Sequence, residues 1–188
     1  QFWLNSSANV LTIGGNIDGV FTLTVVGPGN TTLSGTSVLG AGSVATALTK
    51  TGNGTLTLSG VNLYTGATTV SGGILKLNNA GALGASTVTI GSGGVVDLNG
   101  QTTARNFTSI SGAGQNGGGA LTSSSGTGTL TGSAALVAVS TFTGGVTINN
   151  TTGLTGNFLL MKTGAGTLPI AASTTTSGRN GVNQIDAG

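Results

Sequence analysis

The chain has 188 residues, enough for one domain, with 37 glycines, five Lys or Arg, three Asp, no His and no Cys. Charged residues make up 4 % of the chain, against roughly 25 % in ordinary soluble domains. This composition excludes a disulfide framework, a zinc site and the basic patch that nucleic-acid binding requires. Because 37 % of the residues are hydrophobic, the chain is expected to fold rather than stay disordered.

Short strands are predicted along the whole chain, each rich in Val, Leu, Ile and Thr and bounded by Gly, Asn or Ser. In chain order they are Val10–Ile13, Val20–Val26, Thr55–Leu58, Thr68–Val70, Ile74–Leu77, Thr87–Ile90, Val95–Leu98 and Val146–Ile148. Helix signals are nearly absent, and the one helix-tolerant stretch, Ser133–Val139, is too short to assign. The chain is therefore predicted to be all-β.

An internal repeat distinguishes between the all-β architectures. The segment Leu48–Leu58 recurs in Leu160–Ile170 with its Lys-Thr-Gly-x-Gly-Thr-Leu core preserved. Repeated strand–turn units that cannot bury their own faces are typical of a stacked array. We therefore predict a right-handed parallel β-helix (β-solenoid), a single segment over residues 1–188 that belongs to a larger repeat protein. At ~20–25 residues a coil, the chain makes roughly eight coils.

Residues 48–75 read LTKTGNGTLTLSGVNLYTGATTVSGGIL and resemble the autotransporter-associated β-strand repeat, also called the passenger-associated transport repeat. The matching positions are Lys50, Gly52, Gly54, Thr55, Leu56, Leu58, Gly60, Asn62, Tyr64, Gly66, Thr69, Val70, Gly73 and Leu75. The second copy, 160–170, is partial because no Gly-x-Asn-x-Tyr segment follows it. The resemblance implies bacterial secretion, a β-helical passenger region, and display on the outer cell surface or release. It implies no catalytic residues.

The residues themselves point to no chemistry. Asp18, Asp97 and Asp186 lie far apart in the chain, so paired carboxylates or a calcium site are not expected, and each Asp is predicted to serve a turn. The glycine-rich run Gly112–Gly117 matches a dinucleotide-binding pattern, but no acidic residue follows at the required spacing, so a plain loop is predicted. We predict no catalytic, cofactor-binding or metal-binding residues, and no enzyme.

Two lysines recur at the same repeat position, Lys50 and Lys162. They are open to two interpretations: a ligand contact, or a solvated coil edge that discourages edge-to-edge pairing. The solvated edge is favoured. Tyr64 and Trp3 are expected to fill a core that has few large side chains, with a ligand platform as the alternative.

Three functions are compatible with these observations. The favoured one is a structural passenger or stalk segment of an extracellular protein. The second is a filament or sheath subunit that self-associates through open solenoid ends, since unpaired strand edges invite stacking. The third is an adhesin that contacts cell surfaces or glycans, for which the Thr-x-Thr steps Thr22/Thr24, Thr55/Thr57 and Thr87/Thr89 offer a hydroxyl array. No nucleic-acid partner, cofactor or membrane-spanning segment is predicted.

Overall fold

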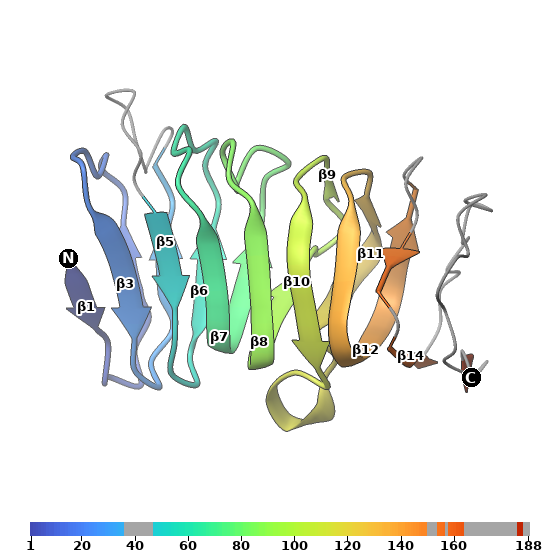
Figure 1. Ribbon diagram of the computed structural model, residues 1–188. Helices are drawn as coiled ribbons and strands as arrows, with labels where there is room; N and C mark the ends of the chain where they lie inside the picture. Colours follow the sequence, from blue (N-terminus) through green and yellow to red (C-terminus); the bar gives the residue numbers. More distant parts are fainter. Residues whose placement is uncertain (36–46, 150–153, 157, 164–183, 186–188) are drawn as a thin grey trace.

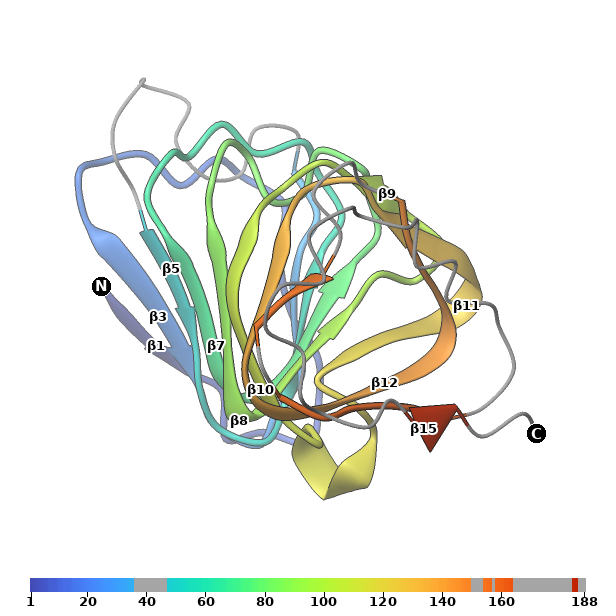
Figure 2. The ribbon, with the colours of Figure 1, turned by 45° about the vertical axis from the view of Figure 1, so that its right-hand side comes forward.

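The chain winds into a parallel β-solenoid, seen from the side in Figure 1 and turned in Figure 2. The computed structural model describes residues 1–35, 47–149, 154–156, 158–163 and 184–185. The solenoid has about seven turns, close to the roughly eight that we predicted. Every strand pair among the described residues is parallel, as the predicted solenoid requires and as a sandwich or meander would not allow.

The strands are β1 (Phe2–Leu4), β2 (Leu11–Ile13), β3 (Thr22–Val26), β4 (Thr31–Leu33), β5 (Ala47–Lys50), β6 (Thr55–Leu58), β7 (Thr68–Leu77), β8 (Val88–Asp97), β9 (Thr102–Thr103), β10 (Phe107–Gly112), β11 (Leu121–Leu130), β12 (Ala134–Ile148), β13 (Leu154–Thr155), β14 (Leu160–Thr163) and β15 (Gln184–Ile185), with one 3₁₀ turn, η1 (Gln115–Gly117). The helix-tolerant stretch Ser133–Val139 falls mainly in β12. Each of the predicted strands overlaps a strand of the structure.

Two faces of the solenoid carry the residues of functional interest. The first face consists of β1, β3, β5, the start of β7, the start of β8, and β10, in that order (Figure 1). The second face consists of β2, β4, β6 and the ends of β7 and β8. Strands β7 and β8 bend at the corner between the faces, so each unites two predicted strands. Thr49 pairs with Thr69 and Thr69 with Thr89, so these two coils take 20 residues each.

The core is a set of inward-facing columns, because side chains alternate across each strand and neighbouring coils lie in register. Leu33, Leu58 and Leu77 form one such column on the second face and are fully or almost fully buried. Several polar side chains interrupt the inward columns. Among them are Thr31 between Leu11 and Leu56, Lys50 between Val25 and Val70, and Thr68 between Leu48 and Val88.

The corner after β5 needs glycine in the next coil. Gly73 has φ 68°, in the left-handed region, and a Cβ there would overlap the Gly52 and Gly54 carbonyl oxygens and crowd the Lys50 ammonium. The absence of a side chain therefore lets two successive corners stack closely around Lys50.

Candidate functional site

Lys50 is the most unusual side chain of the core. It is 2 % exposed, and its Nζ donates hydrogen bonds to the carbonyl oxygens of Thr51 (2.7 Å), Gly52 (2.9 Å) and, one coil further, Gly72 (3.4 Å). Burial lowers the pKa of Lys50 to about 8. The ammonium group therefore joins the corners of two adjacent coils from the inside.

The predicted solvated coil edge is wrong for both recurring lysines. Lys50 follows the inward-facing Leu48 by two residues, so strand alternation turns its side chain into the core. Lys162 is equally buried, and its Nζ donates to the Thr163 carbonyl oxygen at 3.0 Å, matching the bond from Lys50 to Thr51. Burial also lowers the pKa of Lys162. The rest of the predicted partial repeat, 164–170, lies outside the described residues.

A second polar network lies at the start of β7, where Thr68 pairs with Leu48 of β5. The Tyr64 hydroxyl is 2.7 Å from Thr68 Oγ1, which is 2.9 Å from Ser86 Oγ, and Ser86 donates to the Leu83 carbonyl oxygen. The Asn62 amide donates to the Ala82 carbonyl oxygen at 2.7 Å.

Tyr64 is fully buried, which confirms its predicted place in the core, and burial raises its pKa to about 12. Trp3 is partly buried and packs against the core. Asn62 thus joins two coils directly, and Tyr64 supports the Thr68–Ser86 bond that joins them. Because Tyr64 is fully buried, it presents no ring to a ligand.

Asp97 ties three coils together at the edge of the second face. Its Oδ1 accepts the backbone N–H groups of Asn99 and Ser124, both at 2.9 Å. Its Oδ2 accepts the Ser124 hydroxyl at 2.6 Å and lies 3.7 Å from Lys76 Nζ. The bond to Asn99, two residues on, confirms the predicted turn role of Asp97.

Asp18 does not join Asp97, because it lies on an exposed loop. Asp186 lies outside the described residues. Where the structure describes the chain, no three His, Cys, Asp or Glu side chains cluster as metal ligands would. The run Gly112–Gly117 is a loop containing η1, as predicted, and Gln115 Nε2 donates to the Asn53 carbonyl oxygen of an earlier coil.

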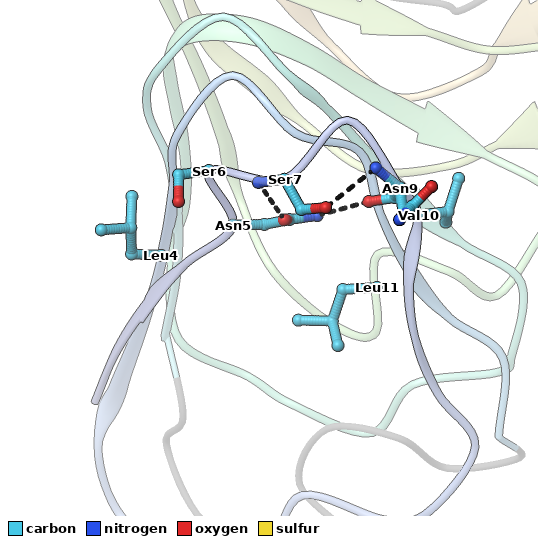
Figure 3. Close-up of a pocket in the computed structure, with 7 residues that line it drawn as sticks. All are labelled: Leu4, Asn5, Ser6, Ser7, Asn9, Val10 and Leu11. Carbon is cyan, nitrogen blue, oxygen red and sulfur yellow. Dashed lines mark hydrogen bonds between the residues drawn. The ribbon is translucent and has the colours of Figure 1, made fainter.

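A shallow hollow of about 380 Å³ opens at the first corner, lined by Leu4, Asn5, Ser6, Ser7, Asn9, Val10 and Leu11 (Figure 3). Its polar groups already bond to one another: Asn5 Oδ1 accepts the Ser7 N–H, and Ser7 Oγ accepts the Asn9 N–H. The Asn5 amide also donates to the Asn30 carbonyl oxygen at 2.6 Å. The hollow contains no titratable side chain and is part of the corner's own structure.

The three Thr-x-Thr steps do not form one array. Thr22/Thr24 and Thr87/Thr89 lie on the first face, in β3 and at the start of β8, whereas Thr55/Thr57 lies in β6 on the second face. The expectation of a single surface built from all three is therefore wrong. In the part of the chain that the structure describes, none of the helical segments has the length and apolar character to span a membrane.

Comparison with known proteins agrees with this geometry. Residues 48–77 match the sequence model of the passenger-associated transport repeat. Over 105 residues, 54 % of this chain, the sequence is 34 % identical to the adhesin BmaC autotransporter of Brucella suis biovar 1 (strain 1330). The match covers 3 % of that relative. No solved structure matches the chain. The chain thus carries an autotransporter-type repeat, as the resemblance of residues 48–75 indicated.

Proposed function

We propose that this chain is a structural segment of the passenger region of an autotransporter-like protein, displayed on the bacterial surface or released from it. The proposal rests on where the side chains of the repeat positions lie and what they bond to. Lys50 and Asn62 turn inward and bond directly to the next coil, and the buried Tyr64 is connected to it through Thr68 and Ser86. The inward repeat positions therefore serve the stacking of one coil on the next, as expected of a stalk.

A non-enzymatic role is part of the proposal. General acid–base or nucleophilic catalysis needs two groups within hydrogen-bond reach of a shared substrate position. The polar clusters of this solenoid use their donors and acceptors to bind neighbouring coils, and the Asp97 carboxylate is occupied by Ser124, Asn99 and Lys76. These contacts support a structural role for the charged groups.

Secretion and display test the proposal. The tagged chain is placed between a secretion signal and an autotransporter translocation domain, and external protease is added to intact cells. We expect the tag to be cleaved from outside, as it is for an unrelated passenger fused in the same way. Retention of the folded chain inside the cells, while the unrelated passenger reaches the surface, would contradict the proposal.

Self-association is the second candidate, favoured by two apolar side chains on the outside of β1. Phe2 and Leu4 lie in register with the outward residues Thr24 and Val26 and are 72 % and 65 % exposed. Exposed apolar side chains of this kind can pack against another copy of the chain. Negative-stain microscopy over a concentration series tests this candidate: uniform fibres support a filament subunit, and a monomer at the highest concentration removes it.

A further inference from the structure

A straight column of hydroxyl groups runs along the outside of the first face. Backbone pairing places Thr24, Thr49, Thr69, Thr89 and Ser109 in register on five neighbouring strands, β3, β5, β7, β8 and β10. We call these five residues the hydroxyl column. With strands ~4.8 Å apart, the column spans roughly 19 Å along the solenoid axis. It follows the strands that face the viewer in Figure 1.

The five hydroxyls are free to bind a partner. Within the described residues, none of the five side chains makes a hydrogen bond, and all five are half-buried rather than covered. Other hydroxyls on the solenoid are engaged: Thr143, for example, donates to the Gly118 carbonyl oxygen at 2.7 Å. A serine or threonine hydroxyl has one donor and two acceptor positions, so the column offers both functions at every coil.

The surroundings of the hydroxyl column are neutral. The outward residues beside it, on these strands or directly next to them, are Thr22, Val26, Ala47, Thr51, Ala67, Ser71, Thr87, Gly91, Thr108 and Ser111. None of these carries a charge; Lys50 in β5 is turned inward, and Lys76 lies at the end of β7 on the second face. Phe2 lies in register with Thr24 and extends the column with an exposed aromatic ring. A partner with charged groups would gain nothing from this surface.

We propose that the hydroxyl column binds a neutral, extended polysaccharide lying along the solenoid axis. The coil spacing is close to the length that one β-linked hexose adds to an extended chain, so successive sugars meet successive hydroxyls. Sugar hydroxyls both donate and accept, as the column does. Phe2 presents a ring face on which the apolar face of a sugar can stack.

The columns on either side favour a linear partner over a crystalline surface. On one side Ala47 and Ala67 separate Thr22 from Thr87, and on the other Thr51 and Ser71 lie between Val26 and Gly91. Hydroxyls therefore repeat regularly in one dimension only. An ice lattice would require a regular array in two.

Binding to cellulose, chitin, β-mannan and mixed-linkage β-glucan tests the proposal, measured with the full chain by co-sedimentation or affinity electrophoresis. The test variant is Thr49→Val with Thr69→Val, which removes two hydroxyls and keeps the branched shape. The matched control is Thr32→Val with Thr57→Val, a pair in register on the second face. We expect at least one polysaccharide to bind, about 5-fold to 150-fold more weakly to the test variant and unchanged to the control.

Several results would overturn the proposal: no binding to any of the four polysaccharides, equal binding by the test variant, or an equal loss in the control. Inhibition of ice growth without polysaccharide binding would also overturn it. Circular dichroism checks that both double variants remain folded. The proposal is independent of the passenger role, because the test variant should still reach the cell surface; failed display of the wild-type chain would count against the passenger role alone.

Discussion

Thr31 and Thr68 are both buried threonines in inward columns, and we expect the same substitution to valine to change stability in opposite directions. Thr31 is 1 % exposed, lies between Leu11 and Leu56, and its Oγ1 has no hydrogen-bond partner among the described residues. Thr68 is fully buried, and its Oγ1 bonds to both Tyr64 and Ser86.

The magnitudes depend on what each hydroxyl loses on folding. A hydroxyl buried without a partner costs about 1–3 kcal/mol, so Thr31→Val should raise the free energy of unfolding by about 1–2 kcal/mol. Thr68→Val instead leaves the buried Tyr64 hydroxyl without its closest partner and should lower that free energy by about 1–2 kcal/mol. For a chain of this length, each change corresponds to about 2–8 °C in the unfolding midpoint.

Thermal and denaturant unfolding followed by circular dichroism measures both variants. Thr57→Val, an outward position of β6, serves as the control and should change the free energy of unfolding by less than about 0.5 kcal/mol. A destabilised Thr31→Val variant would refute the reasoning, because it would mean that the Thr31 hydroxyl is satisfied in the folded protein. A neutral Thr68→Val variant would equally show that the network around Tyr64 contributes nothing.

Three further substitutions test the polar contacts of the core. Burial raises the pKa of Tyr64 to about 12, so Tyr64 ionises at lower pH in the unfolded chain than in the folded protein. The free energy of unfolding of the wild type should therefore fall from pH 10 to 12, and that of Tyr64→Phe should fall much less. Denaturant midpoints measured across this pH range check the difference. Burial lowers the pKa of Lys50 from 10.5 to about 8, so between pH 8 and 10.5 the unfolded chain holds a proton that the folded protein has lost. The free energy of unfolding should therefore rise by ~1–2 kcal/mol over this pH range. Lys50→Met should lack this rise in the same measurement. Gly73→Ala should cost about 2 kcal/mol or more in denaturant unfolding, whereas Gly15→Ala, with open space at its Cβ position, should cost far less.

The solenoid could be predicted because its strand rhythm and its repeat are local features of the sequence. The inward position of Lys50 could also have been predicted, because it follows Leu48 by two residues in an alternating strand. It was missed because a charged side chain is ordinarily assigned to the surface. The carbonyl oxygens of Thr51, Gly52 and Gly72 that receive it come from two coils, and their convergence has no signature in the sequence.

The contacts between coils could not be predicted because they depend on register, and register depends on coil length. One coil takes 20 residues between Thr69 and Thr89, but another takes 27 between Phe107 and Ala134 because it includes the loop around η1. Such differences decide which threonines line up. They explain why Thr24, Thr49, Thr69 and Thr89 share a column while Thr57 belongs to another face.

The side-chain fasteners of the repeat give the molecule a direction. Lys50 reaches forward to Gly72, Asn62 forward to Ala82, and Thr68 forward to Ser86. An extra coil inserted between Leu77 and Asn79 would separate Asn62 and Thr68 from their partners, whereas one inserted ahead of Leu48 would leave all three bonds intact. We therefore expect an inserted coil to disturb the core less ahead of Leu48 than between Leu77 and Asn79.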